Sequence, residues 1–223
     1  MPAIARLHVK RHPKPRVSAT SKWAESLKIN TAELLPPVRG YSKPYARTAR
    51  EVATRAIILQ GVIAVAYKVA AAPIVKWFRA GGIWRGVTSQ ERDLLLGAEL
   101  PEADGFQWQW KQEAEWTLLW MIGKVESLGL PTRCCDTRRL VDEIIPPLGQ
   151  SLRGFIGGAK LRSPGTLLAE DDRTCDLWCR ALAVQRRGET LPPDLNLAVL
   201  RERRYAFEWM DGNQDWDEVT CDA

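Results

Sequence analysis

A carboxylate among indole rings is the feature of this sequence best suited to chemistry. The segment FQWQWKQEAEWTLLWMIG, which begins at residue 106, contains four of the ten tryptophans. In a helix, residues three and four apart are neighbours, so Glu113 shares a face with Trp110 and Trp116. A carboxyl group in apolar surroundings keeps its proton to higher pH and could act as a general acid or base. Glu115 neighbours Lys111 instead, and we expect those two residues to form an ordinary surface pair.

Four further charged residues interrupt helical faces that are otherwise apolar, namely Arg55, Arg180, Glu202 and Arg203. A buried charge is costly, and pairing with an opposite charge offsets part of that cost. We therefore expect some of these residues to meet Glu113 between helices as an ion-pair network. The set either fixes the helix register or forms a polar pocket with tryptophan walls. In the second case the arginines would suit an anionic ligand, because their forked donors match phosphate and carboxylate.

The residue types restrict the reactions that the folded body could catalyse. The only histidines are His8 and His12, so nucleophilic triads that need histidine are excluded from the body. No glycine-rich phosphate-binding motif and no HExxH zinc motif is present. An enzyme would have to rely on carboxylates, so we favour a binding role and keep catalysis as an alternative.

The cysteine pattern predicts reduced thiols and no cofactor. The chain has five cysteines, of which Cys134 and Cys135 are adjacent. An odd number of cysteines without a secretory segment is typical of a cytoplasmic protein. Cys175 and Cys179 are four residues apart and could share one helical face. We expect no metal site, because zinc requires more ligands than this spacing supplies.

Charge is unevenly distributed along the chain. Residues 1–50 contain eleven Lys or Arg and two Glu, whereas the remainder contains 21 basic and 25 acidic residues. We expect residues 1–20 to form a basic, flexible arm ahead of a helical domain at residues 21–223. The arm could contact nucleic acid through phosphates, resembles a transit peptide in composition, or serves only as a solubilising tail.

Hydrophobic periodicity predicts an all-α fold, with one domain of about seven to nine helices. The most apolar segment, Ala56–Tyr67, is too short to span a membrane, so we expect a buried core helix and no membrane contact. Pro73 is expected to end or kink the long helix that contains this segment. Capping residues, prolines and glycines predict helices at residues 21–29, 45–72, 90–96, 108–127, 136–145, 151–160, 164–187 and 194–210.

Several segments together resemble the bacterial domain-of-unknown-function family 4272. They are REVATRA at Arg50–Ala56, WKQEAEWTLLWMIG at Trp110–Gly123, CDLWCRALA at Cys175–Ala183, and RERRYAFEWM with DWDEVTCD within Arg201–Asp222. The resemblance covers nearly the whole chain after the arm. It implies the family's fold and a bacterial origin, but the family's name implies no reaction.

Four residues depart from the family's pattern. Lys111 replaces an arginine, Arg204 and Glu208 stand where histidine and asparagine are usual, and Leu182 lies near the position of another histidine. If those polar residues form an active site in relatives, this member lacks the activity.

The absence of a catalytic motif favours a bacterial interaction protein. One version is an immunity-type protein that neutralises a toxin or effector, an expectation that rests on analogy with small orphan domains. The alternative is an enzyme or anionic small-ligand binder that uses Glu113 with Arg55, Arg180 and Arg203. A deep pocket reaching Glu113 would favour this alternative. Nucleic-acid contact through the basic arm is a third possibility.

Overall fold

The computed structural model describes residues 45–97, 102–212 and 214–221. The predicted basic arm and the predicted helix at residues 21–29 lie outside the described residues. The described part contains eight α-helices and no strand, so the predicted all-α fold is confirmed. None of the described helices is both long enough and apolar enough to cross a membrane.

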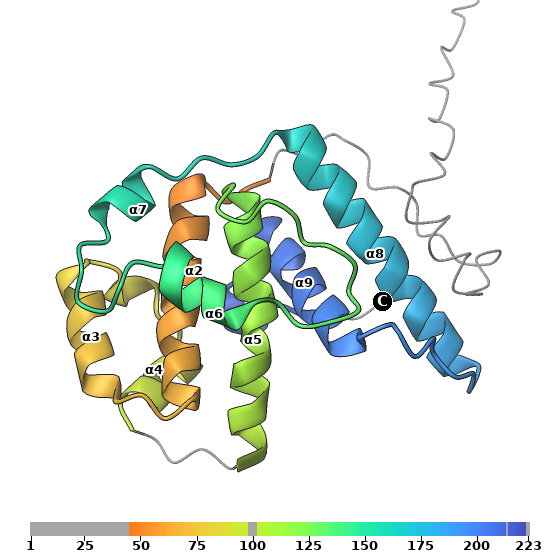
Figure 1. The fold of residues 1–223 in the computed structure, drawn as a ribbon, viewed down its shortest axis with the longest axis horizontal. Helices are drawn as coiled ribbons and strands as arrows, with labels where there is room; N and C mark the ends of the chain where they lie inside the picture. Colours follow the sequence, from red (N-terminus) through yellow and green to blue (C-terminus); the bar gives the residue numbers. More distant parts are fainter. Residues whose placement is uncertain (1–44, 98–101, 213, 222–223) are drawn as a thin grey trace, which may run out of the picture.

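The helices are labelled α2 to α9 in Figure 1. Three further short helical turns are called η1 to η3. Their bounds are α2 Ala49–Ala66, α3 Ala71–Ala80, η1 Trp84–Gly86, α4 Ser89–Leu95, α5 Glu102–Met121, α6 Thr137–Arg139, η2 Leu140–Ile144, α7 Arg153–Gly157, α8 Pro164–Arg186, α9 Leu197–Met210 and η3 Trp216–Glu218.

Helix α5 lies at the centre of the bundle. It packs against α2 on one side and α9 on another, while α8 packs against α9 rather than against α5. Helices α3, α4 and α7 contact α2 and lie on the side of the bundle away from α8 (Figure 1). Residues 112–122, which comprise the second half of α5 and the first residue after it, are all buried. This stretch therefore has no face left for water.

Capping residues set the helix ends largely as their chemistry predicts. The hydroxyl of Thr88 accepts a hydrogen bond from the Glu91 amide, and the Glu91 carboxylate accepts one from the Thr88 amide. Ser163 caps α8, with Pro164 at its first position. Helix α9 is capped by Asn196 and not by Asp194. The sequence offers two acceptable caps two residues apart there, and the amide oxygen of Asn196 is the one that meets the free N–H groups.

The long helix predicted for residues 45–72 is wrong at its C-terminal end. Helix α2 ends at Ala66, and Lys68 adopts a left-handed conformation with φ of 70°. The chain then starts α3 at Ala71, so Pro73 lies in the first turn of a new helix. Proline is tolerated there because the first-turn amides have no partner within the helix.

The helix predicted for residues 108–127 is displaced in the structure. Helix α5 begins at Glu102, in a segment predicted as a loop, and ends at Met121. Gly123 follows with φ of 73°, a conformation that favours glycine and ends a helix. Residues 124–135 are consequently free to form an extended connection, and part of it borders the candidate site.

The buried side chains form two apolar clusters. The larger one joins α2, α3, α5 and most of α9. The smaller one, which includes Leu177, Trp178 and Leu200, joins the second half of α8 to the start of α9. Helix α8 joins the larger cluster through Leu167 near its start, and a cleft lies beside its first half.

The close packing of α2 on α3 predicts the effect of adding a single methyl group. A Cβ atom on Gly61 would lie 2.3 Å from Cζ of Phe78 and 2.7 Å from Cγ2 of Ile74. Both of these side chains are buried, so Gly61→Ala should destabilise the protein by about 1–3 kcal/mol in urea unfolding.

The matched control is Gly105→Ala in α5, where a Cβ atom meets nothing within 4 Å. That substitution should stabilise the protein by up to about 1 kcal/mol through helix propensity. Equal effects at the two sites would contradict the close contact between α2 and α3.

Candidate functional site

Glu113 is fully buried on α5, as its indole surroundings predict. Its Oε1 atom accepts a hydrogen bond from the backbone N–H of Cys135, and no hydrogen-bond partner among the described residues reaches Oε2. Burial raises the pKa of the carboxyl group, and the hydrogen bond together with the charge of Arg203 offsets part of that rise. Glu113 therefore ties the segment around Cys135 to the central helix.

Arg203 is the arginine that acts on Glu113, but the two do not form an ion pair. Its Nη1 and Nη2 atoms donate to the carbonyl oxygens of Gly129 at 2.8 Å and Leu128 at 2.7 Å. The side chain is 4% exposed, and burial lowers the pKa of its guanidinium while Glu113 and Glu170 oppose that shift. The two carbonyl groups accept from Nη1 and Nη2 without cancelling the charge, whereas Nε has no hydrogen-bond partner among the described residues.

Arg55 forms a closed, buried pair that sequence analysis did not foresee. It bonds Glu91 of α4 and also donates to the carbonyl of Gly86 at 3.2 Å. Both side chains are at most 4% exposed, and the guanidinium lies over the Trp216 ring at 5.1 Å. The capping pattern that begins at Thr88 could have indicated the position of Glu91, but not its partner 36 residues earlier.

Glu202 and Arg180 also find local partners. Glu202 pairs with Lys111 at 3.0 Å, and the Lys111 ammonium lies 3.6 Å from the Tyr205 ring centre. Arg180 pairs with Asp176, one turn earlier on α8, at 2.8 Å. The five charged residues are therefore buried, as predicted, but they lie in separate interactions and form no single network.

The expected surface pair of Glu115 with Lys111 is wrong. Lys111 bonds Glu202 on α9, and Glu115 is fully buried with no hydrogen-bond partner among the described residues on either oxygen. Burial raises the pKa of its carboxyl group well above the usual range, because the charged form loses its hydration in the interior. Helical spacing placed the two residues on one face, but contact with α9 decides which carboxylate the lysine reaches.

A further ion-pair cluster joins α8 to α9. Arg204 bonds Asp171 at 2.9 Å and also contacts Glu208, while the Tyr45 hydroxyl donates to Asp171 at 3.2 Å. Sequence analysis noted Arg204 and Glu208 only as departures from a family pattern. Their spacing of four residues could have indicated that they pair with each other.

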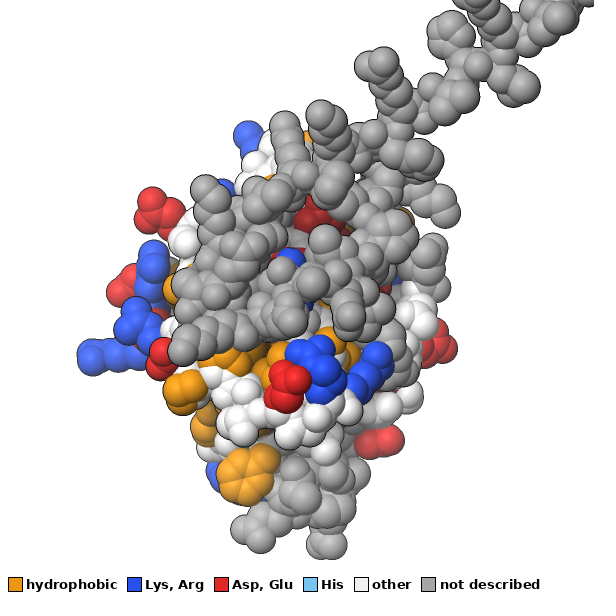
Figure 2. All heavy atoms as spheres, turned by 90° about the vertical axis from the view of Figure 1, so that its right-hand side faces the viewer, with side chains coloured by type: hydrophobic (Ala, Val, Ile, Leu, Met, Phe, Trp, Pro, Cys, Tyr) orange, Lys and Arg blue, Asp and Glu red, His pale blue; other side chains and the backbone are white. Residues whose placement is uncertain are grey.

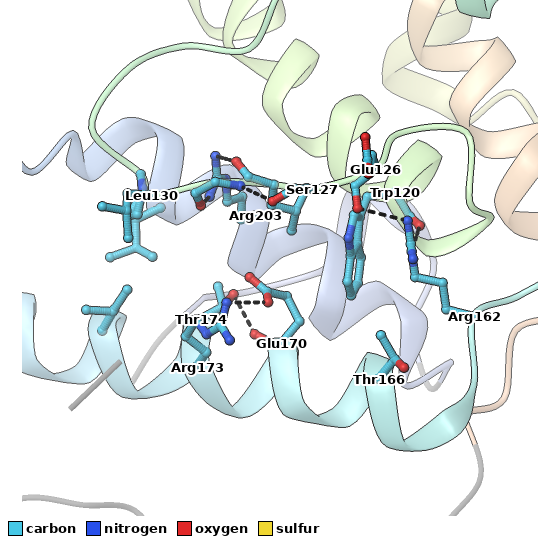
Figure 3. A pocket seen from close by; sticks show the side chains of 15 residues that line it. Trp120, Glu126, Ser127, Leu130, Arg162, Thr166, Glu170, Arg173, Thr174 and Arg203 are labelled. Atoms are coloured by element: carbon cyan, nitrogen blue, oxygen red, sulfur yellow. Dashed lines mark hydrogen bonds and ion pairs between the residues drawn. The ribbon is translucent and has the colours of Figure 1, made fainter. Parts of the chain in front are cut away.

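A cavity of about 450 Å³ opens between the first half of α8, the start of α9 and the loop at residues 126–131. Figure 3 shows Arg203 and Leu130 facing the α8 residues across this cavity, with Trp120 and Arg162 toward one end. Trp120 and several leucines supply apolar walls, and three arginines stand against two glutamates among its lining residues. We call this space the α8 cleft.

The arginines of the α8 cleft come from three separate parts of the chain. Arg162, just before α8, donates to the carbonyls of Trp120 and Val125 at 2.7 Å each, and its guanidinium lies 5.0 Å from the Trp120 ring centre. Arg173 pairs with Glu170 at 2.9 Å and remains 43% exposed. Arg203 completes the set from α9.

A second hollow of about 740 Å³ lies beyond the same loop. It shares residues 127–130 and Arg203 with the α8 cleft and is also lined by Trp116 and residues 132–136. Glu113 lines neither space, and Trp110 is partly buried and lines neither. The candidate site is therefore centred on Arg203 and the loop that it holds. Arg55, Arg180 and Glu202 lie outside its lining.

The described residues contain no group of three or more His, Cys, Asp or Glu side chains that could hold a metal ion. With these features, the chain falls in the class of all-α proteins that carry a basic, tryptophan-walled cleft. A family model described as Domain of unknown function (DUF4272) matches residues 16–219. The chain belongs to this family, as the sequence resemblance predicted. No curated protein and no solved structure matches the chain.

The buried Arg55–Glu91 pair predicts a large effect when one partner is removed. Arg55→Met leaves the Glu91 carboxylate buried and unpaired, and should lower the free energy of unfolding by about 3–5 kcal/mol. Arg187→Met, which breaks the exposed pair with Glu189, should change stability by less than about 1 kcal/mol. Urea denaturation of both variants measures the difference. Similar losses would mean that Arg55 is not buried against Glu91.

The raised pKa of Glu115 predicts a pH-dependent effect of Glu115→Gln. Wild-type stability is greatest below the unfolded pKa of the carboxyl group and is lost as the pH rises through the folded pKa, since ionisation is costly only in the folded state. The variant should therefore gain relative to wild type between pH 5 and pH 8. The expected gain is about 1.4 kcal/mol for each pKa unit titrated.

Glu189→Gln is the control for this measurement. The hydrogen bond from Arg187 lowers the pKa of the exposed Glu189 carboxyl group, so any pH-dependent difference there has the opposite sign. A Glu115→Gln variant that loses stability relative to wild type at higher pH would contradict the raised pKa of the buried carboxyl group.

Proposed function

We propose that this protein acts by binding a protein partner, and that the α8 cleft receives an anionic group of that partner. The observation that carries the proposal is the convergence of Arg162, Arg173 and Arg203 on one cavity that also has apolar walls. Two of these arginines donate to backbone carbonyls, so their hydrogen bonds position them without neutralising them. A carboxylate or phosphate would supply the missing charge.

The size and composition of the site favour a protein partner. The α8 cleft and the second hollow adjoin along the loop at residues 127–130, which together make a longer surface than a small ligand needs. Leu130 is 50% exposed on this loop. Arginine and tryptophan flanked by apolar residues are typical of the residues that dominate protein interfaces.

Figure 2 supports a mixed rather than a uniformly charged surface on the α8 side of the molecule. Among the described side chains in this view, hydrophobic, basic and acidic groups lie beside one another. Such a surface suits a specific protein contact, in which paired charges fix the register of the two partners. A mixed surface of this kind is less suited to non-specific binding of a polyanion such as nucleic acid.

The specific form of the proposal is a bacterial immunity-type protein, in which the partner is a toxin or effector that the chain neutralises. Neutralisation by binding needs a surface and no reacting group. The described residues contain no histidine, and the two glutamates that line the α8 cleft share it with three arginines. Glu113, the acid or base candidate, is fully buried and lines neither the α8 cleft nor the second hollow.

An anionic small ligand is the second candidate, and the volume of the α8 cleft favours it. About 450 Å³ falls within the range of small-molecule sites. In that case the ligand would bind Arg173 at the rim of the cleft, because Arg173 is the most exposed of the three arginines.

Co-purification with the products of neighbouring genes tests the proposal. Full-length protein should retain one of them, and Arg173→Glu should weaken that binding at least about tenfold, because it replaces a positive charge of the α8 cleft with a negative one. Arg153→Glu is the matched control, because Arg153 is exposed on α7, outside the cleft lining. It should bind as wild type does.

Two outcomes would count against the proposal. If Arg173→Glu retains the partner as well as wild type does, the α8 cleft is not part of the interface. If no neighbouring product binds, while pyrophosphate or citrate raises the melting temperature of wild type but not of Arg173→Glu, the small-ligand candidate replaces the protein partner.

A further inference from the structure

Two cysteines on α8 form a feature that the proposed function does not use. Cys175 and Cys179 are one helical turn apart, and both are half-buried free thiols. Their spacing places the two side chains on the same face of α8. Sequence analysis predicted only that they could share a face.

The surroundings of the pair make one of the two sulfurs a strong donor. The hydrogen bond from Cys175 lowers the pKa of Cys179 to about 6, and the positive charges of Arg204 and Arg186 act in the same direction. The same contact raises the pKa of Cys175. Both shifts favour a thiolate on Cys179 over a thiolate on Cys175.

Helix geometry restricts how the pair can react. Residues four apart in a helix have Cβ atoms about 5–6 Å apart, whereas a disulfide needs about 3.5–4.5 Å. Closing a disulfide would therefore distort α8, which is also held to α9 by the ion pair of Asp171 with Arg204. A single atom that bonds both sulfurs spans a wider gap and leaves the helix intact.

We propose that Cys175 and Cys179 form a binding site for thiophilic ligands that take two sulfur donors, of the class of trivalent arsenicals. The site is separate from the α8 cleft, since neither cysteine lines it. Two thiols on one rigid helix act as a chelate, so the second bond forms at a high effective concentration. A soft centre selects sulfur donors over the oxygen donors nearby.

The bonding step is balanced without an oxidant. With an organoarsenic oxide, the sulfurs of Cys179 and Cys175 each form one bond to arsenic, and the bonds from arsenic to oxygen break. The oxygen leaves as water with one proton from Cys175 and one from solvent. Arsenic stays trivalent throughout, and neither sulfur is oxidised.

The chain contains an internal control in Cys134 and Cys135. These two thiols are adjacent, and burial together with the charge of Glu113 raises the pKa of both. Both shifts lower the fraction of the thiolate that starts the reaction. A site defined by the α8 geometry should discriminate between the two pairs.

Phenylarsine oxide and the full-length native protein provide the test. In the presence of excess glutathione, intact mass should show one phenylarsenic group per chain. Trypsin should place it on the Thr174–Arg180 peptide, which contains both cysteines of the pair, and not on the Cys134–Arg138 peptide. Modification found only on the Cys134–Arg138 peptide, or no adduct at all, would overturn the proposal.

Serine variants confirm the need for both sulfurs. Cys175→Ser and Cys179→Ser, verified as folded by circular dichroism, should each lose the adduct to glutathione at least about 100-fold faster than wild type, because a single sulfur forfeits the chelate. The double variant Cys134→Ser/Cys135→Ser should keep it. An adduct equally durable in all variants would show that the α8 pair is not the site. Peptide mapping of the wild type decides the matter if a serine variant fails to fold.

Discussion

Burial of α5 on every side is the constraint on which the rest of the structure depends. Residues 112–122 have no exposed face, because α2 and α9 cover the helix on different sides and the segment after Gly123 folds back over it, with the Cys135 amide bonded to Glu113. The polar groups in that stretch therefore lose water. Each must bond to another element or stay uncharged.

The protein meets this constraint in three ways. Glu202 and Lys111 neutralise each other across α9 and α5, and Arg55 and Glu91 do the same beneath Trp216. Glu115 has no hydrogen-bond partner among the described residues, and burial raises the pKa of its carboxyl group. Arg203 is the exception, since it bonds carbonyl oxygens of the loop at residues 128–129 and retains its charge. That unbalanced charge places the candidate site at this loop.

Helix α8 links the two proposals through its unusual attachment. Its second half shares an apolar cluster with α9, and Arg204 bonds it near the middle. Its first half stands away from α5 and forms one wall of the α8 cleft. The thiol pair lies on the same helix, where the guanidinium of Arg204 that holds the helices together also acts on both cysteines.

The sequence by itself determined the helical class, most helix caps, the largely buried stretch of α2 from Ala56 to Ile63 and the membership in the family. These features depend on local periodicity and on chemistry within one turn, which a single chain displays directly. It also indicated that Arg55, Glu113, Arg180, Glu202 and Arg203 face inward, because a charged residue on an otherwise apolar helical face is buried together with that face.

Tertiary structure alone decided which partners these charged residues contact. Lys111 lies one turn from Glu115 yet bonds Glu202, and Arg203 bonds carbonyls of a loop 74 residues away. Such choices depend on which helices come into contact, and that contact arises from the sum of many packing interactions that no local pattern encodes.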